Sequence, residues 1–160
     1  MIQLYHGSNI RIEVPDLAHS KPYKDFGRGF YLSADKQQAW DMAFQKVNQT
    51  QQGKAEVSEF LFDDSLMTSA NLKVLTYPDY SEEWAKFVLA NRNRNVPQPV
   101  HDYDIVYGPI ANDGVTYQLR RYEGGVISLS RLIEELKYAK GITFQYFFGT
   151  ERALQLLKRP

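Results

Sequence analysis

The sequence predicts a mixed α+β fold, and three observations predict it. Several segments carry apolar residues at helical spacing, and others alternate apolar and polar residues or are rich in strand-forming aromatic side chains. The two kinds of segment follow one another irregularly, which favours α+β over a regular βαβ series. At 160 residues the chain is expected to form one domain, residues 1–160, with a core that needs no disulfides.

The first elements are two strands around a long loop. Ile2–Tyr5 is short and apolar, which predicts an opening strand, and Gly29–Ser33 predicts a second strand. Between them, Gly7–Asp25 is polar and contains Pro15 and Pro22, so it is expected to be a loop. Structureless loops of that length are usually functional or disordered.

A helix, a strand pair and a second helix are expected next. The first helix is capped by Ser33 or Asp35, and its apolar stripe consists of Trp40, Ala43, Phe44 and Val47. Val57–Phe62 and Leu72–Leu75 predict strands. Asp79–Glu82 has the form of a capping box and opens a helix whose stripe consists of Trp84, Phe87, Val88 and Asn91.

The last third predicts two strands and two helices around a turn. Pro97 and Pro99 end the preceding helix, and Tyr103–Tyr107 predicts a buried strand. Asn112–Gly114 has a turn composition and is followed by Val115–Leu119 as a strand or a short helix. The remaining expected elements are a helix over Ser128–Ala139, a strand over Thr143–Phe148 and a final helix capped by Thr150.

Composition excludes several classes of site and protein. The chain has no Cys, so it has no disulfide, thiolate zinc site or cysteine nucleophile. The three His residues are scattered, so no metal site is expected. Neither a signal peptide nor a run of about 18 apolar residues is present, which predicts a cytoplasmic protein without a membrane partner.

Net charge is zero, but the charge is unevenly distributed. Residues 1–54 carry seven Lys or Arg against five Asp or Glu, and residues 114–160 carry eight against four. Residues 55–113 carry four against ten. A neutral total argues against a long polyanionic partner, whereas the basic ends are compatible with a local site for a pyrophosphate.

Three short segments combine residues with chemical potential. They are Leu4–Ser8 at the end of the opening strand, Asp25–Ser33, and Phe144–Thr150 near the other end of the chain. The glycines around Arg28 are not a dinucleotide-binding fingerprint, because Leu32 stands where the third glycine should be. A phosphate-binding Gly-Lys-Ser/Thr loop is absent as well.

Together, in this order, the segments resemble the ADP-ribosyltransferase superfamily, in its branch with a His–Tyr–Glu-type triad. More closely, the chain resembles a family of small bacterial ADP-ribosyltransferase-like proteins. The matching motifs cover nearly the whole chain and lie at Leu4–Asn9, Asp25–Leu32, Glu83–Arg92, Asp102–Asp113 and Gln145–Leu154. The resemblance implies a split antiparallel β-sheet core with peripheral helices.

The resemblance also implies NAD as co-substrate and a catalytic triad of His6, Tyr31 and Gln145. His6 would bond a ribose hydroxyl of the adenosine half, Tyr31 would stack on the nicotinamide ring, and Gln145 would bond the 2′-hydroxyl of the nicotinamide ribose. The further NAD-binding residues implied are Tyr5, Gly7, Ser8, Arg28, Gly29 and Tyr146. Gly7 would offer its backbone to the nicotinamide amide, and Ser8 would bond the nicotinamide ribose. Tyr5 and Tyr146 would border the nicotinamide ring.

Charged residues near the motifs extend this expected site. Arg28 is expected to meet the pyrophosphate together with other basic residues, Arg11, Lys21 and Lys24. Gln145 departs from the superfamily, whose triad usually ends in Glu, because an amide supplies only a dipole where a carboxylate supplies a charge. Glu151, six residues on, is the candidate for a substitute carboxylate.

The expected function is therefore mono-ADP-ribosylation rather than chain elongation. Nicotinamide would leave from NAD, and ADP-ribose would pass to a protein or nucleic-acid acceptor. Such an enzyme would act as a bacterial toxin or as an effector delivered to another cell, with a cognate inhibitor or antitoxin as a further partner. Two alternatives stay open, a non-catalytic NAD or ADP-ribose binding module and an NAD glycohydrolase.

Overall fold

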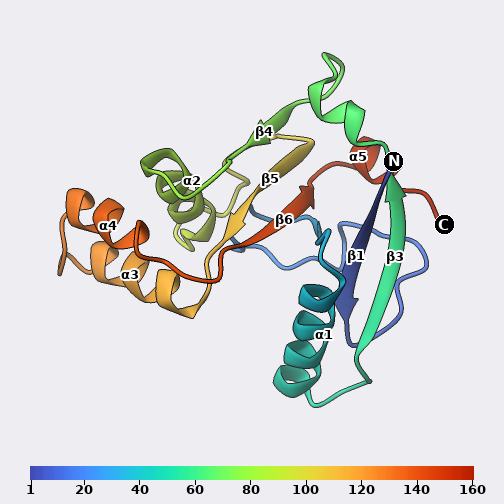
Figure 1. The fold of residues 1–160 in the computed structure, drawn as a ribbon, viewed down its shortest axis with the longest axis horizontal. Coiled ribbons are helices and arrows are strands. Elements are labelled where there is room, and N and C mark those ends of the chain that lie inside the picture. Colours follow the sequence, from blue (N-terminus) through green and yellow to red (C-terminus); the bar gives the residue numbers. More distant parts are fainter.

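The structure is a computed structural model that describes all residues, 1–160, and it has a mixed α+β fold. Its six strands form two sheets (Figure 1). One sheet pairs β1 (Ile2–Ser8) with β3 (Glu56–Phe62). The other has the order β2-β6-β5-β4, from β2 (Phe30–Leu32), β6 (Thr143–Phe148), β5 (Ile105–Ile110) and β4 (Val74–Thr76).

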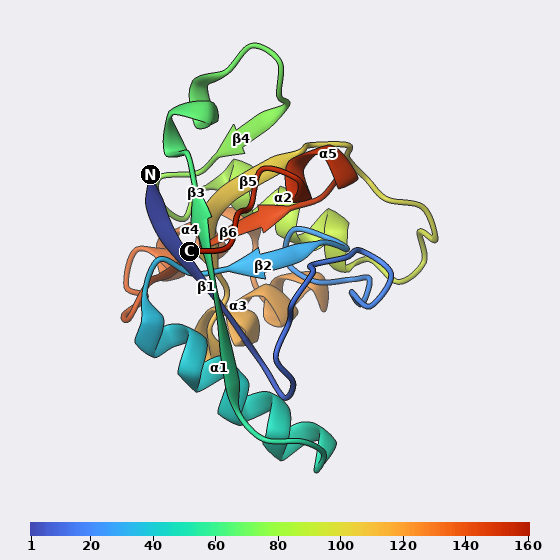
Figure 2. The ribbon, with the colours of Figure 1, turned by 90° about the vertical axis from the view of Figure 1, so that its right-hand side faces the viewer.

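The two sheets meet at one point and then diverge. Tyr5 of β1 and Ser33, just after β2, form an isolated antiparallel bridge and exchange both backbone hydrogen bonds at 2.8 Å. No further ladder joins β1 to β2, so the chain has a split sheet. Figure 2 shows β1 and β3 crossing in front of the second sheet.

Three of the four strand pairs are antiparallel, and one is not. The pairs β1–β3, β2–β6 and β5–β6 are antiparallel, whereas β4 runs parallel to β5. The expected antiparallel core is therefore a mixed sheet at the β4 edge. The return from β4 to β5 passes through α2 (Glu82–Arg92), which provides the crossover that a parallel pair needs.

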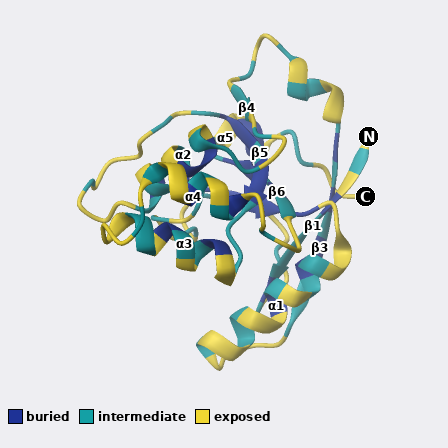
Figure 3. Ribbon diagram, turned by 60° about the vertical axis from the view of Figure 1, so that its left-hand side comes forward, coloured by how far each residue is buried: buried dark blue, intermediate teal, exposed yellow.

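Helices cover the outer regions of both sheets. In Figure 1, α1 (Lys36–Thr50) runs beside β1. On the other side, α2 groups with α3 (Asp113–Glu123) and α4 (Leu129–Leu136). A 3-10 helix, η1 (Asp64–Thr68), precedes β4, and α5 (Glu151–Leu154) follows β6. Figure 3 shows buried residues along β5 and β6 between these layers, and all three residues of β2 are buried as well.

Two apolar clusters lie on opposite faces of the second sheet, because successive strand residues point to opposite sides. Tyr31 and Phe147 pair across β2–β6 and belong to the cluster that packs against α2, α3 and α4. Their neighbours Phe30 and Phe148 also pair, and they belong to the cluster that includes Leu4 and Phe60 of the first sheet.

Most predicted elements are present, with two corrections in the helices. The capping residue of α2 is Ser81, whose hydroxyl accepts from Trp84 N at 3.0 Å, so the predicted box beginning at Asp79 was wrong. Asn112 does not sit in a turn; its side chain caps α3 by accepting from Val115 N at 2.9 Å. A turn and a helix N-cap both favour Asn, because in both its side chain forms hydrogen bonds with the nearby backbone.

The predicted apolar stripe of α1 was also wrong in part. Its buried residues are Ala39 and Ala43, whereas Phe44 is 56% exposed and stacks on Trp40 with ring centroids 5.9 Å apart. The reason is Gly7, which leaves room for the backbone of α1. A Cβ atom placed on Gly7 would lie 1.9 Å from Ala39 O. Small residues therefore face β1, and the large aromatic rings lie outside.

Candidate functional site

Three strands bring together the residues of the predicted triad. His6 lies on β1, Tyr31 on β2 and Gln145 on β6. Gln145 and Phe147 share one face of β6, and Phe147 pairs with Tyr31, so Gln145 and Tyr31 lie on the same face of the sheet. His6 reaches this region because β1 diverges from β2 immediately after the Tyr5–Ser33 bridge.

His6 is held in one orientation, with one ring nitrogen bonded to the backbone of β2. Its Nδ1 lies 2.7 Å from Tyr31 O, and its ring stacks on Phe30 with centroids 4.2 Å apart. A carbonyl oxygen only accepts hydrogen bonds, so Nδ1 carries the proton. Burial lowers the pKa of His6 to about 4, and therefore the ring is neutral at pH 7. Nε2 then keeps a free lone pair.

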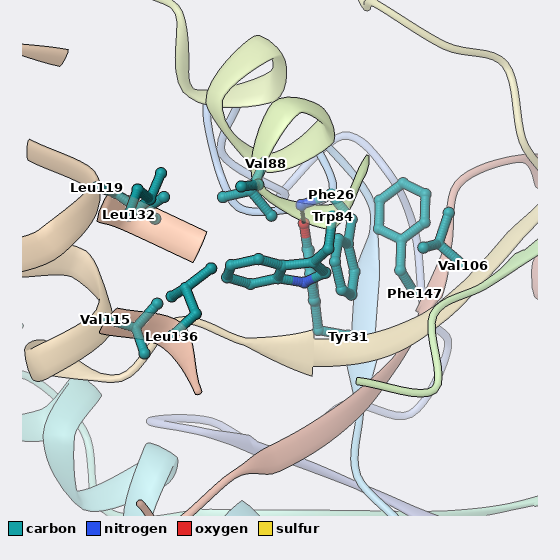
Figure 4. Packing of buried hydrophobic residues seen from close by; sticks show 11 residues of the cluster. Phe26, Tyr31, Trp84, Val88, Val106, Val115, Leu119, Leu132, Leu136 and Phe147 are labelled. Carbon is teal, nitrogen blue, oxygen red and sulfur yellow. Dashed lines mark hydrogen bonds between the residues drawn. The ribbon is translucent and has the colours of Figure 1, made fainter. Parts of the chain in front are cut away.

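Tyr31 is buried, and hydrogen bonds hold its hydroxyl in place. Its hydroxyl donates to Gly27 O at 2.6 Å and accepts from Phe26 N at 3.0 Å, and Figure 4 shows this hydroxyl directed toward Phe26. Burial raises the pKa of Tyr31 well above its usual value, so the phenol stays protonated. The ammonium of Lys24 lies over the ring, 5.1 Å from its centroid.

Gln145 is buried, and Met42 of α1 determines how its amide is turned. Gln145 Nε2 lies 2.6 Å from Met42 Sδ. A thioether sulfur can only accept, so the amide nitrogen must face it. The carbonyl Oε1 of Gln145 is thereby directed away from Met42 and is available to accept a hydrogen bond.

The triad faces two cavities that meet at Tyr31. The His6 cavity has a volume of about 430 Å³ and is lined by His6, Ser8, Lys24, Gly29, Tyr31 and Lys46, among others. The Gln145 cavity has a volume of about 440 Å³ and is lined by Lys24, Tyr31, Met42 and Gln145, among others. Lys24 and Tyr31 are the residues common to both cavities. We call the two cavities together the groove.

The split of the sheet also leaves backbone groups of β1 at the edge opposite β3, although Gly7 itself lines neither cavity. Tyr5 directs both its N–H and its C=O at Ser33. Since alternate residues of a strand direct these groups to the same edge, Gly7 offers its N–H and C=O toward β2 rather than β3. The isolated Tyr5–Ser33 bridge does not continue to this position.

Other predicted site residues lie outside the groove. Tyr5 bonds Gln3 Oε1 through its hydroxyl, and the Tyr146 ring packs on Phe62 and Tyr107 on the opposite face of β6 from Gln145. Arg28 lines a third cavity of about 510 Å³, beside His101. Glu151 is exposed at the start of α5 and lines neither groove cavity. Of the other predicted cations, Arg11 lines the His6 cavity and Lys21 lines neither.

Met42 and Lys46 of α1 are among the groove residues that sequence reasoning missed. Neither belongs to a motif, and the apolar pattern of α1 did not distinguish its inner face.

Hydrogen bonds of the Asp25 side chain connect three of the sequence motifs. Asp25 accepts from Arg92 Nε at 2.7 Å and from Ala111 N at 2.8 Å. This carboxylate therefore joins the loop before β2 to α2 and to the end of β5.

The structure contains no group of three or more His, Cys, Asp or Glu side chains placed to hold a metal ion. None of its helices has the length and apolarity that crossing a membrane requires. The groove is lined by imidazole, phenol, amide and ammonium groups, among others.

Comparison with known proteins places this α+β, split-sheet protein in one family. Residues 2–159 match the family described as "Protein of unknown function (DUF3990)". The match covers almost the whole chain, so the protein belongs to this family. No curated protein and no solved structure matches the chain significantly.

Proposed function

We propose that the protein is an NAD-dependent mono-ADP-ribosyltransferase. In this reaction the bond between nicotinamide and ribose breaks, nicotinamide leaves with the bonding electron pair, and a nucleophile of the acceptor bonds the ribose carbon and loses a proton. The observation that carries the proposal is the meeting of two cavities at Tyr31, one containing His6 and the other Gln145.

Each groove residue has a chemical role toward NAD. The unprotonated Nε2 of His6 accepts from a hydroxyl of the adenosine ribose, because its Nδ1 is occupied by Tyr31 O. The N–H and C=O of Gly7 bond the carboxamide of nicotinamide, and the ring of Tyr31 stacks on the pyridine ring. Ser8, which lines the His6 cavity, bonds the nicotinamide ribose.

Gln145 supports slow, single transfer. Cleavage builds an oxocarbenium-like charge on the ribose, which a carboxylate stabilises more strongly than an amide dipole. The Oε1 atom of Gln145 accepts from the 2′-hydroxyl and places its negative end near this charge. No spare carboxylate replaces it, since Asp25 in the same cavity is bonded to Arg92 and Glu151 lies outside.

Labelled NAD tests the reaction. The pure protein is incubated with adenylate-labelled NAD and bacterial or eukaryotic extracts, and labelled macromolecules are separated before and after nuclease treatment. We expect label on one class of acceptor, and loss of label in His6→Ala and Tyr31→Ala. Absence of transfer, together with unchanged NAD binding in both variants, would contradict the proposal.

The neutral amide of Gln145 favours a second candidate, a module that binds NAD or ADP-ribose without cleaving it. The Gln145→Glu variant separates the two. A transferase should release nicotinamide about tenfold faster with the carboxylate restored, whereas a binding module should release none. An NAD glycohydrolase would yield free ADP-ribose and no modified macromolecule.

A further inference from the structure

Two lysines of the groove lack a counter-ion. The lysine ion pairs of the structure involve other residues, namely Lys36, Lys54, Lys73 and Lys86. Lys24, from the loop before β2, and Lys46, from α1, both line the His6 cavity and form no ion pair. Two ammonium groups from separate elements therefore line one cavity without an ion-pair partner.

The two carboxylates that line that cavity bond partners other than the two lysines. Glu13 pairs with Arg11 at 3.0 Å and with Arg159 at 2.9 Å. Asp16 accepts from His19 at 2.8 Å. His6 is neutral, so it adds no charge of its own. The cavity is therefore locally positive although the chain is neutral.

The charge of Lys46 affects the pKa values of Lys24 and His6. Burial is the main cause that lowers the pKa of Lys24, and the charge of Lys46 comes next. Lys46 also contributes to the lowered pKa of His6, after burial and the charge of Lys24. A dianion placed between Lys24 and Lys46 would relieve this repulsion and form charge-assisted hydrogen bonds with both.

Lys24 also covers the surface on which a ligand ring would stack. Its Nζ lies 5.1 Å from the Tyr31 ring centroid, a distance typical of a cation–π contact. Lys24 and Tyr31 are shared by the two cavities, so this side chain stands where they meet. A pyridine ring can stack on Tyr31 only after the ammonium moves.

We propose that Lys24 is a cap that the pyrophosphate of the substrate removes. The pyrophosphate binds between Lys46 and Lys24, draws the Lys24 ammonium off the Tyr31 ring, and so opens the stacking surface for nicotinamide. This inference rests on the proposed use of NAD and adds a selection for it. Nicotinamide alone must displace Lys24 without compensation, whereas a pyridine dinucleotide brings the anion that displaces it.

Binding of nicotinamide with and without inorganic pyrophosphate tests the cap. For the wild type we expect saturating pyrophosphate to raise nicotinamide affinity about threefold, which is the loss of an exposed cation–π contact. Lys24→Gln should bind nicotinamide more tightly without pyrophosphate and show no further gain. Wild-type affinity that pyrophosphate does not change, or no nicotinamide binding in either condition, overturns the cap.

Binding of ADP-ribose tests the anion site separately. Lys46→Gln should weaken ADP-ribose binding about tenfold, the effect of one charge-assisted hydrogen bond. Lys86→Gln, on α2 outside both cavities, is the matched control and should bind as the wild type does. Equal affinities in Lys46→Gln and Lys86→Gln overturn the anion site even if ADP-ribose transfer is observed. Conversely, an expected binding pattern without transfer contradicts the transferase and leaves the cap standing.

Discussion

At the scale of single residues, the protonation of His6 is set by its burial. Its pKa of about 4 lies below the ordinary 6.5, so the unfolded state takes up the proton first as pH falls. The free energy of unfolding should therefore decrease from about pH 6.5 to about pH 4 through this residue. Nitrogen NMR should show a neutral ring protonated on Nδ1 down to pH 5. A proton on Nε2, or a pKa near 6.5, would contradict the site geometry.

Gly7 is a residue at which a single methyl group should disturb the fold. In Gly7→Ala the new Cβ would lie 1.9 Å from Ala39 O, so α1 must move off β1. We expect a loss of about 3 kcal/mol in the free energy of unfolding, measured by urea denaturation. Gly114→Ala is the control, because its Cβ meets only Asn112 Oδ1 at 3.5 Å. Equal stability of the two variants would show that α1 does not pack as described.

At the scale of elements, Asp104 ties α5 to β5 and β4. It is 1% exposed, accepts from Arg152 Nε at 2.8 Å, from Thr150 Oγ1 at 2.6 Å and from Lys73 N at 2.8 Å. The hydrogen bonds of Arg152 are the main cause that lowers the pKa of Asp104 to about 2. A lowered carboxyl pKa gives stability that is present above about pH 4 and lost as pH falls to about 2.

The variant Asp104→Asn measures that contribution. It should unfold at lower denaturant concentration than the wild type at pH 7, and the gap should narrow as pH falls from about 4 to about 2. The check is denaturant unfolding of both proteins across this range. A stability difference between the two proteins that does not depend on pH would mean that the charge of the Asp104 carboxylate does not stabilise the fold.

Element prediction succeeded where one physical signal dominated. The strand Thr143–Phe148 and the cap at Thr150 are as expected, because aromatic runs and N-cap side chains are local signals. The stripe of α1 was misjudged because Gly7, far away in sequence, makes the helix face that carries Ala39 and Ala43 the inner one. The sequence of α1 alone therefore does not indicate which of its faces packs closely against β1.

At the scale of the whole molecule, the groove exists because two sheets share one bridge and then separate. The sequence motifs located His6, Tyr31 and Gln145, and these three residues do line the groove. Motif proximity also suggested Tyr146, which faces the other side of β6 because successive strand residues alternate in direction, and Arg28, which lies in the loop before β2 and lines a third cavity. Lys46 and Met42 were unpredictable, since only the docking of α1 beside β1 brings them there.

Calorimetric titration of NAD into the pure protein tests most directly the proposed binding of NAD in the groove. Tyr146→Phe, on the opposite face of β6, should bind NAD as the wild type does, whereas His6→Ala should bind about tenfold more weakly for want of the Nε2 acceptor. Equal affinities in the two variants, or no NAD binding by the wild type, would contradict the account.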